Sequence, residues 1–131
     1  MKPLNNMRRK DKMKTSVTKI VKFETAHQLT DSYSKECQVI HGHSYKCEVT
    51  FEGGVNEDTG MIMDFKLIKE LLQEVVDKYD HQFFTKDTFD DRNPTAENMC
   101  VDIFNMVRSN TVLITRVRLW ETDTCYAQVG Y

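Results

Sequence analysis

Apolar and polar side chains alternate in two stretches of the first half of the chain, a pattern typical of half-buried β-strands. The first stretch runs from about Val17 to His27. One of its sides carries Val21, Phe23, Thr25 and His27. The second stretch alternates polar residues with the row His43, Tyr45, Cys47, Val49 and Phe51. These patterns predict two neighbouring strands, with a possible short edge strand at residues 61–63 after the glycine-rich turn.

Two later stretches repeat apolar residues at three- and four-residue steps, the spacing of one helix face. The first follows Asp64, whose carboxylate can cap a helix. Its apolar face comprises Leu67, Ile68, Leu71, Leu72, Val75, Val76 and Tyr79. The second begins at Asn93-Pro94-Thr95, where a cap residue and a proline are both common. Its face comprises Ala96, Met99, Cys100, Ile103, Phe104 and Val107.

Two further strands end the chain. Leu113, Thr115, Val117 and Leu119 alternate with the charged Arg116 and Arg118. Cys125, Ala127 and Val129 follow a polar turn. The order ββααββ predicts an α+β fold, with an antiparallel sheet and two helices packed on one face.

Length and charge indicate one domain with a basic tail. The chain has 131 residues and a net charge of −2, but residues 1–14 carry six basic residues and one acid. We predict a disordered tail at 1–14 and a single domain at 15–131, because the tail lacks the aromatic or amphipathic pattern of a nucleic-acid-binding arm. The remaining chain is acidic, which argues against nucleic acid as a partner. We expect a cytoplasmic protein without membrane contact, because no apolar run is long enough to span a bilayer or to act as a secretory signal.

All four histidines fall into two short clusters. His41 and His43 are two residues apart, so their rings project from the same face of a strand, and strand pairing could bring His27 beside them. Three neutral imidazoles with an open fourth position are typical of a catalytic zinc site. The competing interpretation is that these are buried, hydrogen-bonded strand histidines, but we predict zinc.

Cys37 precedes this cluster in a polar loop, whereas Cys47, Cys100 and Cys125 lie on apolar stripes and are expected to be core residues. Cys37 could be a fourth zinc ligand, an inert thiol, or a reactive base or nucleophile. A reactive thiolate needs a pKa lowered by a cation or a metal. His81, preceded by Asp80, could supply that cation. A histidine at a helix C-terminus also interacts favourably with the helix dipole, so both interpretations of Asp80-His81 stay open.

Glu121 lies where the fourth predicted strand meets a turn. Such a residue is usually a surface glutamate. A carboxylate at the mouth of a pocket can instead bind a guanidine-like edge through two parallel hydrogen bonds.

In this order, the residues resemble the family of 6-pyruvoyltetrahydropterin and 6-carboxytetrahydropterin synthases. The matching segments cover roughly residues 17–130. They are Phe23-Glu24-Thr25-Ala26-His27, Cys37-x-x-x-His41-Gly42-His43, Thr59-Gly60-Met61-Ile62-Met63-Asp64-Phe65, Asp80-His81, Asn93-Pro94-Thr95-Ala96-Glu97-Asn98 and Glu121-Thr122.

The resemblance implies the tunnelling fold (T-fold), whose ββααββ subunit has the order predicted above, and assembly as a homohexamer of two trimers with active sites at subunit interfaces. It also implies zinc held by His27, His41 and His43, with Cys37 as the proton acceptor. Asp80 and His81 would form a proton relay, and Glu121 would anchor the pterin ring. Thr95 belongs to a stretch that approaches the pterin in relatives.

The short spacing between Cys37 and His41, and the pair Asp64-Phe65, resemble the 6-carboxy branch of queuosine (7-deazapurine) biosynthesis. The expected reaction converts 7,8-dihydroneopterin triphosphate to 6-carboxy-5,6,7,8-tetrahydropterin, acetaldehyde and triphosphate. Candidate cations for the triphosphate are Lys35, Arg92, Arg116 and Arg118. The alternatives are the pyruvoyl-forming reaction, an epimerase or aldolase acting on dihydroneopterin derivatives, and a non-catalytic module stabilised by zinc.

Overall fold

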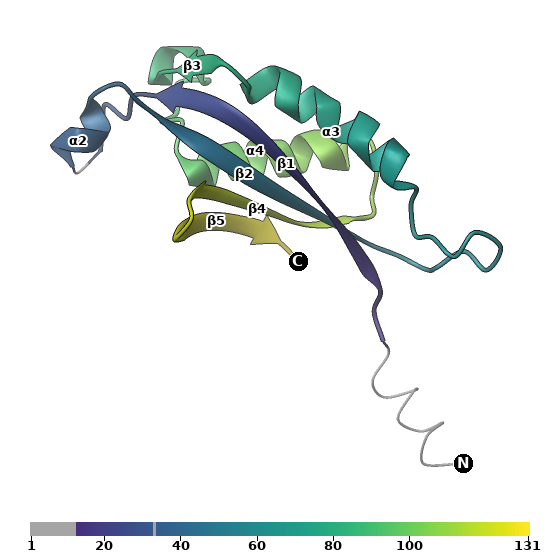
Figure 1. Ribbon diagram of the computed structural model, residues 1–131. Coiled ribbons are helices and arrows are strands. Elements are labelled where there is room, and N and C mark those ends of the chain that lie inside the picture. The colour runs from purple at the N-terminus through teal and green to yellow at the C-terminus, as the bar shows by residue number, and fades with distance from the viewer. Residues whose placement is uncertain (1–12, 33) are drawn as a thin grey trace.

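The computed structural model describes residues 13–32 and 34–131, which form one five-stranded sheet with helices on one face (Figure 1). Residues 1–12, which hold most of the predicted basic tail, lie outside the described residues. The strand order is β3-β1-β2-β4-β5. The α+β architecture expected from the sequence is confirmed.

Four of the strands pair antiparallel, as predicted. They are β1 (Ser16–His27), β2 (His41–Glu52), β4 (Ile114–Thr122) and β5 (Cys125–Gly130). The register of β1 and β2 places His27 opposite His41 and Thr25 opposite His43. Directly opposed residues project to the same side of a sheet, so this register sets the geometry of the site.

The fifth strand was not predicted. β3 (Gln82–Phe84) is three residues long and pairs parallel with the end of β1. A strand this short has almost no periodic signal, so only its pairing identifies it. The predicted edge strand at 61–63 was wrong, because these residues close a turn in which the Asn56 amide donates to the Met61 carbonyl at 2.9 Å.

Helices α3 (Phe65–Tyr79) and α4 (Ala96–Arg108) cover one face of the sheet (Figure 1). Asp64 caps α3 by accepting from the Lys66 amide at 2.8 Å, as predicted. Thr95 caps α4 by accepting from the Asn98 amide at 3.2 Å. Two short helical segments, α2 (Lys35–Gln38) and η1 (Lys86–Thr88), lie in the connections.

The core lies between this sheet face and the two helices. All six predicted apolar residues of α4 are buried, and in α3 the buried residues are Ile68, Leu72, Val75 and Tyr79. Leu67 is 47% exposed, so its inclusion in the buried face was wrong. Phe23 stacks between Tyr45 and Tyr79 with centroids 5.5 and 5.4 Å away. Burying each large apolar side chain contributes about 1.5–3 kcal/mol.

Cys47 and Cys100 are buried as predicted, but Cys125 is exposed. It begins β5 at an edge of the sheet, next to the turn from β4, where an alternating pattern does not guarantee a covering layer. All four cysteines are free thiols.

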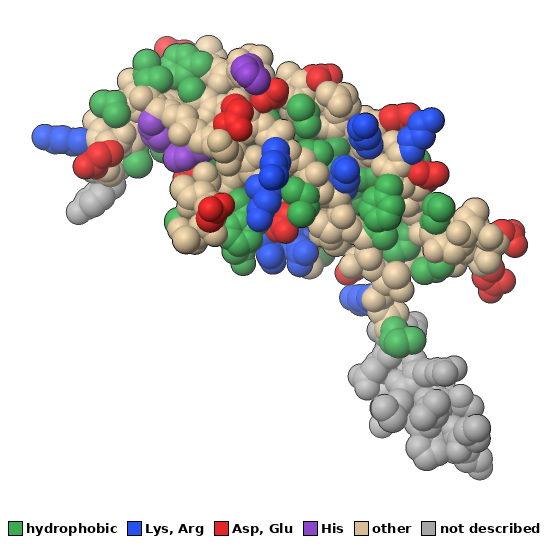
Figure 2. Space-filling model, viewed as in Figure 1, with side chains coloured by type: hydrophobic (Ala, Val, Ile, Leu, Met, Phe, Trp, Pro, Cys, Tyr) green, Lys and Arg blue, Asp and Glu red, His purple; other side chains and the backbone are tan. Residues whose placement is uncertain are grey.

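Within residues 13–32 and 34–131, no helix packs on the other face of the sheet. Register places Lys22 opposite Lys46, and Glu48 opposite Arg118, on this face. Figure 2 shows Lys and Arg side chains over the middle of the molecule. No helix among the described residues is long and apolar enough to cross a membrane.

Candidate active site

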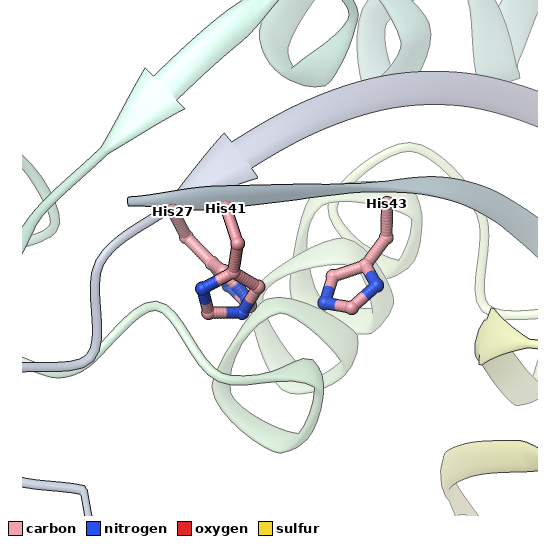
Figure 3. A group of neighbouring side chains, drawn as sticks. All are labelled: His27, His41 and His43. Carbon is pink, nitrogen blue, oxygen red and sulfur yellow. The ribbon is translucent and has the colours of Figure 1, made fainter. Parts of the chain in front are cut away.

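Three imidazoles meet on the helix-covered side of the sheet, where β1 ends and β2 begins (Figure 3). His27 is buried, and His41 and His43 are half-buried. One potential ligand atom from each ring lies within 4.8 Å of the other two. The Nε2 atoms of His27 and His41 are 2.8 Å apart. The predicted grouping of the three histidines is therefore present, drawn together by strand pairing and two-residue alternation.

Backbone carbonyls orient two of these rings. The Nδ1 atom of His27 lies 2.7 Å from the Pro94 carbonyl oxygen, and Nδ1 of His41 lies 2.8 Å from that of Val39. A carbonyl can only accept, so the Nδ1–H group donates and Nε2 keeps its lone pair. Metal-binding histidines usually show this second interaction.

The donor set fits a divalent metal such as zinc. Burial, together with the neighbouring imidazoles, lowers the pKa of His27, and burial likewise lowers the pKa of His43. Both effects favour the neutral ring, which is the form that binds metal. Three imidazoles leave a fourth tetrahedral position for water or substrate, as in catalytic zinc sites.

Glu121 lies beside these imidazoles rather than on the open surface. Its Oε1 atom is 3.2 Å from Nε2 of His43 and 3.6 Å from Nε2 of His27. It also lines a hollow of about 300 Å³ with Ala96, Glu97, Cys125, Tyr126 and Ala127. A carboxylate at the edge of a hollow can bind a planar donor edge.

Sequence reasoning missed Tyr45 and Pro94. The buried Tyr45 hydroxyl donates to Glu121 Oε1 at 3.4 Å and lies 3.4 Å from Nδ1 of His27. The two-residue period did place Tyr45 in the same row as His43, but nothing in the sequence indicated its contacts with Glu121 and His27. The contribution of Pro94 comes from its backbone, so its side-chain type gave no signal.

Cys37 lies in α2, the short helix before β2, and is half-buried. Its carbonyl accepts from the Leu29 amide at 3.0 Å, which closes the loop between β1 and β2. The sulfur is not part of the group of ligand atoms formed by the three imidazoles. Cys37 therefore lies on the loop that leads into the site, outside the imidazole cluster.

Asp80 and His81 form a pair at the C-terminal end of α3. Nδ1 of His81 lies 2.9 Å from Asp80 Oδ2, and Asp80 Oδ1 accepts from the Glu24 amide at 2.9 Å. These hydrogen bonds lower the pKa of Asp80. His81 adopts a left-handed backbone conformation with φ of 57° and is exposed.

The Asp80–His81 pair is separate from the imidazole cluster within one chain. His81 lines a hollow of about 420 Å³ with residues that include Glu24, Ala26 and Ser44. Glu24 and Ala26 alternate with Thr25 and His27 along β1, and Ser44 follows His43 on β2, so their side chains project to the opposite face of the sheet. Thr25 and His43 also border this hollow. Figure 2 also shows histidine side chains at two separate places on the surface.

The sequence matches the family model for 6-pyruvoyl tetrahydropterin synthase over residues 16–130. The chain belongs to this family. The matched range includes His27, His41 and His43, in agreement with the resemblance seen in the motifs.

Individual relatives carry several names. A protein of Archaeoglobus fulgidus, provisionally named 6-carboxy-5,6,7,8-tetrahydropterin synthase, is 36% identical over 82% of this chain and 88% of its own length. The 6-carboxy-5,6,7,8-tetrahydropterin synthase of Rickettsia bellii is 29% identical over 86% of this chain and 97% of its own. The dihydroneopterin monophosphate aldolase of Pyrococcus furiosus is 33% identical over 83% and 91%, respectively.

Solved structures support the fold. The 6-pyruvoyl tetrahydropterin synthase of Caenorhabditis elegans superposes with a TM-score of 0.81 and covers 91% of this chain and 96% of its own. Its sequence is 23% identical to this one. The T-fold expected from the motifs is therefore confirmed.

Proposed function

We propose that this protein is a zinc-dependent 6-carboxy-5,6,7,8-tetrahydropterin synthase acting on 7,8-dihydroneopterin triphosphate. The observation that carries the proposal is the convergence of His27, His41 and His43 within 4.8 Å, with Glu121 beside them. The names of the Archaeoglobus and Rickettsia relatives favour the 6-carboxy branch. Queuosine or another 7-deazapurine would be the end product, made in the cytoplasm.

His27, His41 and His43 would hold the zinc ion. When bound, zinc supplies Lewis-acid polarisation of the substrate's side-chain hydroxyls, which acidifies the neighbouring C–H and O–H bonds. The protein contributes three imidazole rings whose potential ligand atoms lie within 4.8 Å of one another, with His27 buried and the other two half-buried.

Glu121 would bind the pterin ring. Its carboxylate accepts from the donor edge of the ring, as a carboxylate accepts from a guanidinium, and the hollow beside it receives the ring. The Tyr45 hydroxyl donates a hydrogen bond to this carboxylate and helps to orient it. Thr95, whose hydroxyl caps α4, would fix the helix end that borders this hollow.

Cys37 would accept the proton from the substrate side chain, with Asp80 and His81 as its relay. The pair lies on the opposite sheet face from the imidazole cluster, so this proposal requires that a second copy supply it. The proposed homohexamer, a dimer of trimers, provides such neighbours. Asp80 orients the His81 ring through its Nδ1–H, leaving Nε2 to exchange a proton.

The surroundings of the four candidate cations support one of them as the proposed triphosphate ligand. Arg92 is held by Asp102, and Arg116 and Arg118 project from the open sheet face. Lys35 lies on α2 with Cys37. We therefore propose Lys35 as the cation that binds the triphosphate in the site of the same chain.

Two related reactions are the alternatives. The family model and the Caenorhabditis structure are named for the pyruvoyl-forming enzyme, which eliminates triphosphate without cleaving the side chain. The Pyrococcus relative favours an aldolase, which would cleave between the first two side-chain carbons.

Product analysis separates these reactions. The zinc-loaded protein is incubated with 7,8-dihydroneopterin triphosphate, and products are identified by mass. Acetaldehyde with 6-carboxytetrahydropterin supports the proposal. Triphosphate with an intact three-carbon side chain indicates the pyruvoyl reaction, and 6-hydroxymethyldihydropterin with a phosphorylated two-carbon aldehyde indicates the aldolase. No reaction, with stability lost on chelation, would indicate a zinc-stabilised module.

A further inference from the structure

An ion pair outside the cluster holds the segment that contacts His27. Arg92 donates to both carboxylate oxygens of Asp102, from Nη2 at 2.7 Å and from Nη1 at 3.2 Å. Its guanidinium lies over the Phe89 ring, 4.8 Å from the centroid. Asp102 belongs to α4, so this pair ties the loop before the helix to the helix itself.

The segment that follows Arg92 is fixed at several further points. The Asn93 carbonyl accepts from the Thr95 amide and from Nδ2 of Asn98, both at 2.8 Å. Pro94 is buried, and its ring fixes φ. Its carbonyl oxygen lies 2.7 Å from Nδ1 of the buried His27. Only Asn93 lies between Arg92 and Pro94, so a displacement of Arg92 reaches the Pro94 carbonyl through two peptide units.

The geometry points to Arg92 and Asp102 as positioning residues for the metal site: their ion pair holds the Pro94 carbonyl where it selects the His27 tautomer with Nδ1 protonated. That tautomer presents a lone pair on Nε2 to the cluster. The inference rests on the metal role of His27 proposed above. Neither side chain touches the imidazoles, so the effect is transmitted through the 92–94 backbone.

Arg92 is suited to this role because its planar group makes two parallel hydrogen bonds, which fix direction as well as distance. The hydrogen bonds from the Asp102 carboxylate raise the pKa of Arg92 above its ordinary value. An arginine is charged at any working pH, so what the pair adds is direction. Lysine at this position would retain the charge without the paired geometry.

The test measures zinc affinity in variants of the full chain by competition with a chromogenic chelator. We expect Arg92→Gln and Asp102→Asn each to weaken zinc binding about 10–100-fold, the range for loss of groups that orient metal-binding histidines. The double variant should bind zinc no more weakly than either single variant, because both lose the same pair. Arg92→Lys should recover part of the affinity.

Arg108→Gln is the matched control. Arg108 also belongs to α4 and donates to the Tyr131 hydroxyl at 2.9 Å, but at the end of the helix remote from Pro94. It should bind zinc as the wild type does. If Arg92→Gln fails to fold, the near-isosteric Asp102→Asn alone decides the outcome.

A second readout does not require metal. The ¹⁵N shifts of the His27 ring in chelator-treated protein report which nitrogen carries the proton. The wild type should show Nδ1–H, and Asp102→Asn a mixture of tautomers. Unchanged tautomer and zinc affinity within twofold of the wild type would overturn the inference. If the wild type binds no zinc, the proposed function is refuted. The tautomer measurement still tests whether the Arg92–Asp102 pair selects the protonated nitrogen of His27.

Discussion

The carboxylate of Glu121 lies 3.2 Å from Nε2 of His43, although the two residues come from β4 and β2. This contact joins the residue proposed to bind the pterin ring to one proposed to bind zinc. Substrate binding and metal binding therefore involve neighbouring groups. Variants at the two positions should nevertheless have different effects.

Removing one imidazole should abolish zinc binding and activity together. His41→Ala leaves two of the three ligands, which is too few for a catalytic zinc site. We expect less than a tenth of the wild-type zinc content by elemental analysis of untagged protein, together with loss of turnover. Full zinc content in this variant would exclude His41 as a ligand. His81→Ala is the control, and it should retain zinc because His81 lies outside the cluster.

Neutralising Glu121 should weaken pterin binding while zinc is retained. Glu121→Gln keeps the shape but loses a charge-assisted pair, for which a loss of about 1.5–3 kcal/mol is typical. The dissociation constant for a non-reacting pterin, measured by fluorescence quenching, should rise roughly 10–100-fold. Unchanged affinity would disprove the anchoring role. Glu97→Gln, at the same hollow, is the matched control.

Removing the Cys37 thiol should affect turnover alone. Cys37 is half-buried in the short helix α2, outside the imidazole cluster, so Cys37→Ala should retain the fold and zinc content. Loss of a positioned proton acceptor lowers the rate about 10²–10⁴-fold. Single-turnover kinetics with 7,8-dihydroneopterin triphosphate measures the effect. Near-normal turnover would remove Cys37 from the mechanism.

Two of the four thiols should react readily in the folded protein, and the other two should be protected. Burial raises the pKa of Cys100 to about 11 and raises that of Cys47 as well, whereas Cys37 is half-buried and Cys125 exposed. The thiolate is the reactive form. Labelling of folded protein at pH 8, followed by peptide mass analysis, should modify Cys37 and Cys125 quickly. Cys47 and Cys100 should react only after unfolding, and early modification of either would contradict the described packing.

Metal-free protein should lose stability as the pH falls below 6.5. The pKa of His27 is lowered from 6.5, so the unfolded state binds a proton before the folded state does. The contribution of His27 to the free energy of unfolding should therefore be constant near pH 7–8. It should decline as the pH falls below 6.5. Urea titrations of chelator-treated protein at several pH values measure this slope. His27→Gln should have a smaller slope, and an identical one would assign the effect to other groups.

Much of the fold could be predicted from the sequence because its signals are local. Two-residue alternation gave β1, β2, β4 and β5, and the three- to four-residue spacing gave α3 and α4. The cap residue Asp64 and the segment Asn93-Pro94-Thr95 gave the two helix starts, and the structure shows that Thr95 caps the second helix. β3 could not be found this way, because its three residues are defined by pairing with β1.

The imidazole cluster was also within reach, because the same alternation that defines a strand places His41 and His43 on one face. The sequence further identified Cys37, Asp80, His81 and Glu121 as chemically notable. The sequence could not show how these four residues lie relative to one another or to the imidazole cluster. Only the tertiary structure placed Glu121 against His43 and set the Asp80–His81 pair on the opposite face.

The sequence by itself therefore determined the elements other than β3 and the short segments α2 and η1, the buried side of β1 and β2, and the residue types available for chemistry. The tertiary structure decided which of these residues meet, and it added the Pro94 carbonyl and the Arg92–Asp102 pair. The physical reason is the range of the interactions. Periodicity and capping act within a few residues, whereas contacts between distant segments depend on strand register, helix packing and backbone groups that every residue shares.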